Sequence, residues 1–146
     1  MRRPALAGLV ALAAGACGGT EPIELAASYT LTGVEGVAPP QVVGATVECD
    51  VSVGGGRMTS TPSQQFDLQL DVLTECPRGG GSTSESTYGY TGTVEIEGRR
   101  VTFHTSRGNL GPLDFEGTVS SAGRLDVVVP FLVPIVEQVS LEFAPD

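Results

Sequence analysis

His104 is the only histidine among the 146 residues, so a Ser-His-Asp catalytic site in this chain would have to use it. The alternation of the flanking residues places it on the polar side of a strand over 99–107, where it would face solvent. No Gly-x-Ser-x-Gly motif supplies a nucleophile. We therefore predict an ordinary surface histidine and no enzyme activity.

Carboxylates recur in pairs two or four residues apart, an arrangement that could run glycoside hydrolysis or bind calcium. No calcium-loop motif accompanies them, and a zinc site would need further ligands. Each pair stands where the alternation of a strand requires polar side chains, so we predict solvated strand faces, no metal and no cofactor. The pairs are Glu48 with Asp50, Asp67 with Asp71, Glu95 with Glu97, and Asp114 with Glu116.

The start of the chain has the pattern of a secretory signal peptide. Met1 to Arg3 is basic, Ala5 to Ala14 is apolar apart from one glycine, and small residues then lead directly to Cys17. The cysteine after small residues resembles the lipobox of bacterial lipoproteins, whose cysteine is lipidated and becomes the mature N-terminus. The resemblance implies a signal peptide over 1–16, a membrane anchor on Cys17 and, because Gly18 rather than Asp follows, the outer membrane. Plain secretion and an uncleaved anchor are the alternatives.

Cys49 and Cys76 remain as an even pair if Cys17 carries lipid. Exported proteins meet an oxidising compartment in which such pairs usually form disulfides. Both cysteines lie on the apolar side of their expected strands, so their thiols could meet inside a barrel or at its rim. We predict a structural disulfide, in preference to a redox pair, whose cysteines would usually be closer in sequence.

The sixteen N-terminal residues also affect the charge. Without them, 6 arginines stand against 17 acidic residues, a formal charge of −11. Such an acidic surface repels phosphate backbones, so we predict no nucleic-acid partner. Residues 18–27 are small, polar and interrupted by Pro22, which indicates a flexible tether before a domain over 28–146.

From Ser28 onward the apolar residues recur with a period of two, the pattern of strands with one buried face. The sequence predicts an irregular connection over 34–43, a break at Gly54–Gly56 and a long loop over 78–86. About eight strands joined by tight turns predict an all-β fold, an antiparallel up-and-down meander that closes into a barrel. A two-sheet sandwich is the alternative.

The run Ser28-Tyr29-Thr30-Leu31, a Pro-bearing loop and successive hairpins resemble small lipocalin-like lipoproteins. The resemblance covers most of residues 28–143 and implies a lipocalin-like barrel, which is informative about shape more than about function.

Residues 127–136 form an uninterrupted apolar stretch with two prolines. Proline is rare in central strands, so we predict a connection between the last two strands. It would plug one end of the barrel, line a ligand mouth, touch lipid near the anchor or dock a partner; the residues concerned are Pro130, Phe131, Leu132, Val133 and Pro134.

Two functions are compatible with these features. The first is a lipid-anchored envelope protein that binds a small apolar ligand, and a barrel interior filled with side chains would argue against it. The second is a non-catalytic structural or interaction module that contacts another envelope protein.

Overall fold

The fold is all-β. The computed structural model describes residues 23–106, 112–133 and 135–146, and no helix long and apolar enough to cross a membrane occurs among them. The strands are β1 (Ser28–Val34), β2 (Gln41–Ala45), β3 (Asp50–Ser60), β4 (Gln65–Cys76), β5 (Ser82–Glu97), β6 (Arg100–Ser106), β7 (Pro112–Val119), β8 (Leu125–Val133) and β9 (Val136–Pro145).

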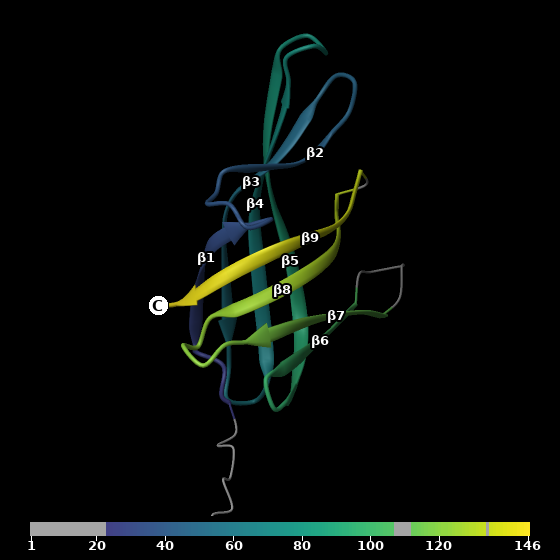
Figure 1. The fold of residues 1–146 in the computed structure, drawn as a ribbon. Helices are drawn as coiled ribbons and strands as arrows, with labels where there is room; N and C mark the ends of the chain where they lie inside the picture. Colours follow the sequence, from purple (N-terminus) through teal and green to yellow (C-terminus); the bar gives the residue numbers. More distant parts are fainter. Residues whose placement is uncertain (1–22, 107–111, 134) are drawn as a thin grey trace, which may run out of the picture.

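Eight of the nine strands close an antiparallel barrel, as the sequence predicts. Neighbours follow the order β1-β9-β8-β7-β6-β5-β4-β3, and β1 also pairs with β3, which closes the ring (Figure 1). Tight turns join most consecutive strands, so neighbours in sequence are neighbours in the sheet. Closure leaves no continuous open edge around the ring, whereas the two-sheet sandwich, the predicted alternative, would have open edge strands.

The ninth strand, β2, prolongs β1 along the same edge of β3. β1 pairs with β3 at residues 57–59, and β2 pairs with it at residues 50–53, so both run antiparallel to β3. Between them the chain makes a connection that includes the cis Pro39–Pro40 peptide bond. The predicted irregular segment over 34–43 is therefore shorter than expected, because its last residues already belong to β2.

Two predicted interruptions are wrong. Gly54–Gly56 lies inside β3, where a bulge opposite Val72 and Asp71 absorbs the glycines. The predicted loop over 78–86 is a turn of only residues 77–81, because Ser82–Ser86 pairs in regular register with β4. Hydroxyl residues suit a solvated strand as well as a loop, so composition alone misleads here. The β4–β5 hairpin consequently extends beyond the closed barrel (Figure 1).

Apolar side chains fill the barrel interior. An aromatic cluster lies at its centre, with Phe103 stacked on Phe115 at 4.8 Å between ring centroids and Phe66 edge-on to Phe103 at 5.0 Å. Leu, Val and Met side chains from the barrel strands continue this core, and β5 and β6 contribute Tyr90, Val94 and Val101 besides Phe103.

The two ends of the barrel differ. One end carries the start of β1 and the β3–β4, β5–β6 and β7–β8 turns. The other end carries the β1–β2 connection and the β2–β3, β4–β5 and β8–β9 turns (Figure 1). We call these the N-terminal end and the far end.

Candidate functional site

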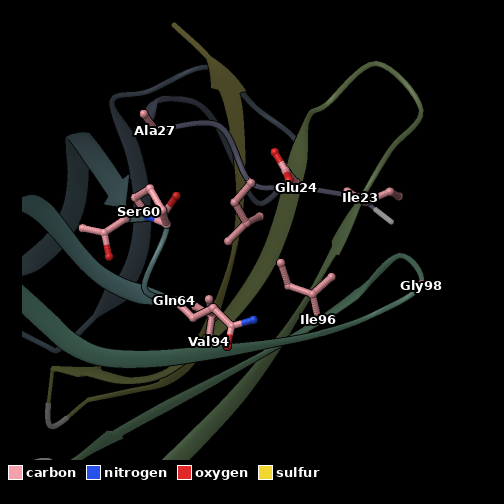
Figure 2. A pocket seen from close by; sticks show the side chains of 11 residues that line it. Ile23, Glu24, Ala27, Ser60, Gln64, Val94, Ile96 and Gly98 are labelled. Atoms are coloured by element: carbon pink, nitrogen blue, oxygen red, sulfur yellow. The ribbon is translucent and has the colours of Figure 1, made fainter. Parts of the chain in front are cut away.

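A pocket of about 420 Å³ lies at the N-terminal end of the barrel. Residues 23–27 form one side, and β5 with the β3–β4 and β5–β6 turns forms the rest. Figure 2 shows Ile23 and Glu24 across from Val94 and Ile96 of β5. The lining residues are Ile23, Glu24, Leu25, Ala27, Ser60, Thr61, Pro62, Gln64, Val94, Ile96 and Gly98.

Backbone and side-chain hydrogen bonds hold the N-terminal wall in place. The Ser60 hydroxyl donates to the Ala26 carbonyl at 2.8 Å, and the Ser60 N–H donates to the Ala27 carbonyl at 3.0 Å. The Ala26 N–H donates to the hydroxyl of buried Tyr29 at 2.9 Å. Residues 23–27, which the sequence places in a tether, are therefore fastened to the barrel, and their apolar side chains pack against its core.

The opposite wall is fixed as well. The Val94 N–H of β5 donates to the Gln64 carbonyl at 2.8 Å, which ties β5 to the β3–β4 turn. Gln64 has a positive φ of 60°, so it closes the turn in a left-handed conformation. A pocket with walls held in this way is largely formed before a ligand arrives, which lowers the ordering cost of binding.

The lining of the pocket is mostly apolar, with one carboxylate. Ile23, Leu25, Val94 and Ile96 supply apolar surface, and Glu24 supplies a carboxylate. The formal charge of the whole chain is −9, so an anionic ligand would meet repulsion both at the rim and at long range. The volume lies within the range of small-molecule sites, roughly 300–1,000 Å³.

Aromatic side chains fill the middle of the barrel. The two described pockets lie at the N-terminal end and on the β3–β5 part of the sheet. Phe66, Phe103 and Phe115 occupy the middle of the barrel. A ligand inside the barrel, as in a hollow lipocalin, would have to displace them.

The apolar stretch at Pro130–Pro134 is not the predicted connection. β8 continues through it to Val133, with a register shift after Pro130, and β9 begins at Val136. The β8–β9 connection is at the far end, so it lies away from residues 23–27. Pro134 and the side chains of Phe131 and Leu132 lie outside the described part of the structure. Val133 is buried in the core.

Pro130 is tolerated in β8 because its ring nitrogen faces an edge with no partner. The backbone N–H of Val119 points to the β6 side, where it donates to the Arg99 carbonyl. The backbone groups of the preceding Thr118 therefore point to β8, and those of its partner Asp126 point to β7. By alternation Pro130 also faces β7, but the described β7–β8 pairing ends at Val127. Its carbonyl instead accepts a hydrogen bond from the Tyr90 hydroxyl at 3.1 Å.

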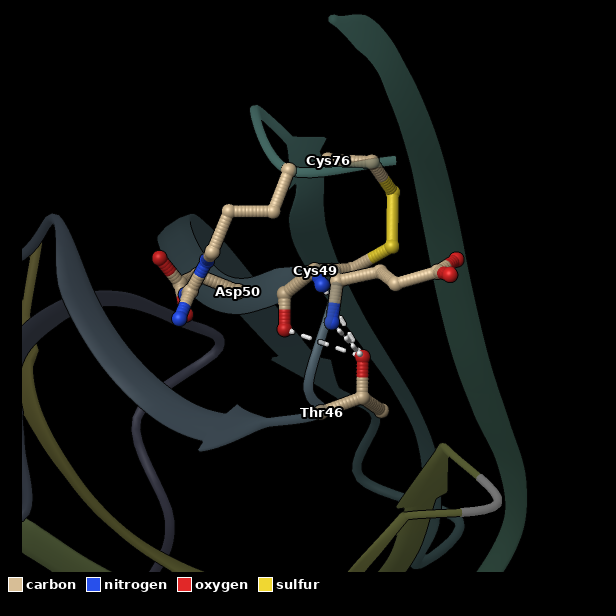
Figure 3. Close-up of a disulfide and its surroundings, with 6 residues drawn as sticks. Thr46, Cys49, Asp50 and Cys76 are labelled. Carbon is tan, nitrogen blue, oxygen red and sulfur yellow. Dashed lines mark hydrogen bonds and ion pairs between the residues drawn. A yellow bond between two sulfur atoms is a disulfide. The ribbon is translucent and has the colours of Figure 1, made fainter. Parts of the chain in front are cut away.

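The disulfide between Cys49 and Cys76 is present, with a sulfur–sulfur distance of 2.04 Å. It joins the β2–β3 turn to the last residue of β4 at the far end of the molecule (Figure 3). The Thr46 hydroxyl accepts a hydrogen bond from the Cys49 N–H at 2.9 Å, and Arg78 pairs with Asp50 at 3.2 Å. The bridge is at the rim, one of the two predicted positions. Cys17 lies outside the described residues.

His104 lies on the outer surface of the barrel, between carboxylates from both neighbouring strands. Its Nδ1 is 3.1 Å from Asp114 Oδ1 of β7, and its Nε2 is 3.5 Å from Glu95 Oε2 of β5. No serine, cysteine or threonine nucleophile hydrogen-bonds to it in the described part of the chain, so the arrangement is an ion-pair cluster rather than a triad.

The pKa of His104 is raised above its ordinary value of 6.5, chiefly because Asp114 accepts a hydrogen bond from the protonated ring. A raised folded-state pKa means that the contribution to folding is full below 6.5 and disappears as the pH rises through the folded-state pKa. We expect an NMR titration of the single histidine to have its midpoint above 6.5, and Asp114→Asn to move this midpoint down. Asp126→Asn on β8 is the control, and an equal downward shift in that variant would contradict the assigned cause.

The remaining paired carboxylates lie on the outer faces of their strands or in turns. No group of three or more His, Cys, Asp or Glu side chains with ligand geometry occurs among the described residues. Their exposure on strand faces agrees with the alternation that predicted it. Sequence reasoning missed the pocket, because the alternation Ile23-Glu24-Leu25 covers only three residues and follows Pro22 in a segment that the sequence assigns to the tether.

Comparison with protein-family models, with curated proteins and with solved structures finds no match to this chain.

Proposed function

We propose that the chain is a lipid-anchored protein of the cell envelope that binds a small uncharged apolar molecule in the pocket at its N-terminal end. The observation that carries the binding proposal is the pocket of about 420 Å³ with apolar lining and hydrogen-bonded walls. The lipobox-like sequence at Cys17 supports the anchor and the outer membrane as its place.

The position of the pocket suits such an anchor. Ile23, which lines it, is six residues after Cys17 in the sequence. Six residues span at most about 20 Å, so the pocket of an anchored protein would stay close to the membrane surface. Apolar molecules that partition into the membrane would then have a short path to the site.

Filling the pocket should weaken binding of an apolar probe. We expect the uncharged dye N-phenyl-1-naphthylamine to gain fluorescence on binding the purified protein, and Ile96→Trp to weaken its binding by about tenfold or more, because the larger ring occupies the ligand volume. An anionic naphthalene sulfonate dye should bind more weakly than the uncharged one because of the acidic surface.

Thr93→Trp is the matched control, since Thr93 is exposed on the outer face of the same strand. It should leave dye affinity unchanged. Equal binding by the Ile96→Trp variant and the unmodified protein would place the dye elsewhere and remove the proposed site.

A second candidate function, an interaction module without a small ligand, is favoured by the far end of the molecule. Val37, Val42, Val47 and Ile135 are all exposed there, and Val47 is 86% exposed. Gly44 lies against Val136 and Ile135, so β2 and the β8–β9 turn bring part of this apolar surface together. Exposed apolar groups of this kind mark contact surfaces when they gather.

A further inference from the structure

Part of β5 has no described strand beside it on the β6 side. β5 pairs with β4 from Ser82 to Thr93, but its pairing with β6 begins only at Gly92. Within the described ranges, no strand pairs with β5 on the β6 side between Ser82 and Gly89. This eight-residue segment, which we call the β5 edge, belongs to the hairpin that extends beyond the barrel (Figure 1).

The direction of the backbone groups at this edge follows from two hydrogen bonds. The Val94 N–H points to the β4 side, where it donates to the Gln64 carbonyl, and the Thr91 carbonyl points to the β6 side, where it accepts from the Thr105 hydroxyl at 2.5 Å. Register with β4 is regular along the edge, so the alternation continues. The N–H and C=O groups of Thr83, Glu85, Thr87 and Gly89 therefore point away from β4, to the open side.

The point at which β6 leaves β5 is set by a close backbone approach. A Cβ at Gly92 would lie 1.9 Å from the His104 carbonyl oxygen, so only glycine fits there. The Thr105 hydroxyl then covers the Thr91 carbonyl, the last one before the strands part. The opening of the β5 edge is thus built into the sequence at Gly92.

The β5 edge lacks the usual protection against pairing with another chain. Proteins guard open edges with lysine, proline or bulges. The segment Ser82–Gly89 contains no lysine and no proline, and its pairing with β4 has no bulge. Residues 82–87 are exposed, so no other described part of the chain covers them.

Beside the edge lies a second pocket, of about 450 Å³ and acidic. Asp71 and Glu85 line it, and neither forms an ion pair within the described part of the chain. The Thr87 hydroxyl donates to Asp71 at 3.4 Å, which places this carboxylate across β4–β5 from the open side. A strand added at the open side would lie directly beside Glu85. Asp71 is one strand farther away, about 10 Å from the added backbone, so only a long lysine or arginine side chain would approach it.

We propose that the β5 edge binds an extended basic segment of another protein by strand addition. Backbone groups at Thr83, Glu85, Thr87 and Gly89 pair with the added strand, and its alternate lysine or arginine side chains meet Glu85 and Asp71. A second copy of this chain fits less well, because two strongly acidic molecules repel each other. The surface is separate from the N-terminal pocket and does not depend on a ligand there.

Peptide binding tests the proposal directly. We expect a fluorescent eight-residue peptide alternating valine with lysine to bind the full chain, and its valine–glutamate counterpart to bind at least about tenfold more weakly. Backbone amide NMR signals should shift at Thr83, Glu85, Thr87 and Gly89. Equal affinity for the two peptides, or shifts confined to other strands, would overturn the proposal.

Two variants locate the site. Thr87→Pro removes an outward N–H without touching the β4 ladder and should weaken the lysine peptide by about tenfold. Glu85→Lys is a second variant, in case the proline variant fails to fold, and it should weaken binding of the lysine peptide by about fivefold or more. Glu97→Lys makes the same charge change where β5 is paired with β6, and it should change the affinity for this peptide by less than about twofold. An equal loss of peptide affinity in the two lysine variants would indicate unspecific electrostatic attraction and would overturn the proposal. A dimer in sedimentation that Thr87→Pro dissociates would also overturn it, because the edge would then bind a second copy of the chain.

Discussion

Replacing Phe103 by alanine should lower the free energy of unfolding by about 3–5 kcal/mol, the range for truncating a buried aromatic side chain. Phe103 is 0% exposed, stacks on Phe115 and meets the edge of Phe66. The barrel wall around it is a continuous hydrogen-bonded sheet, which resists collapse into the space left behind. Urea denaturation followed by circular dichroism measures the change.

Two further variants separate packing from strand propensity. Phe103→Leu keeps much of the buried volume, so it should lower the free energy of unfolding by less than half as much as Phe103→Ala. Thr102→Ala removes a side chain from the outer face of the same strand and should change stability by no more than about 0.5 kcal/mol. If all three variants lost the same stability, the core cluster would not be the dominant contact of β6.

The fold class followed from the sequence because alternation in a strand reports burial directly. Leu68 and Leu70 on β4 are buried, and Gln69 between them lies on the other face, as the period of two requires. The same reasoning put Cys49 and Cys76 on one side of their strands, and the disulfide joins them. Such local patterns need no knowledge of which strands are neighbours.

Strand ends were harder to predict because they depend on neighbours. Gly54–Gly56 has the composition of a turn, yet β3 pairs with β4 on both sides of these glycines, and a bulge accommodates them within the strand. Pro130 looks incompatible with a strand until the pairing shows that its nitrogen faces β7 beyond Val127, where the described β7–β8 pairing ends. Both errors come from judging a residue by its type, when the decisive fact is which edge it faces.

The candidate site was missed for a related reason. The N-terminal pocket joins residues 23–27 to Val94 and Ile96, about seventy positions later in the chain, and this contact depends on how the barrel closes. Isolated apolar residues before the first strand resemble a tether in sequence. The hydrogen bonds from Ser60 to Ala26 and Ala27, together with the bond from Ala26 to the Tyr29 hydroxyl, show that the segment belongs to the folded body.

Removing the disulfide with Cys49→Ser and Cys76→Ser together should lower the free energy of unfolding by about 3–4 kcal/mol, from the loop-closure entropy of a bridge between residues 27 positions apart. The loss should be local as well as global. The bridge fastens the β2–β3 turn to β4 at the far end, so hydrogen exchange should rise most in β2 and the neighbouring ends of β3 and β4. The amides around Phe103, in the closed part of the barrel, should change least.

Both proteins would carry Cys17→Ser, so that the bridge is the only cysteine chemistry that differs. A reductant should shift the urea midpoint of the bridged protein toward that of the double variant, and it should leave the double variant unchanged. This comparison separates the bridge from the effect of the serine side chains, since reduction leaves both cysteines in place. Equal urea midpoints for the bridged protein and the double variant would mean that the bridge does not reduce the entropy of the unfolded chain measurably. The entropic explanation of the stabilisation would then fail.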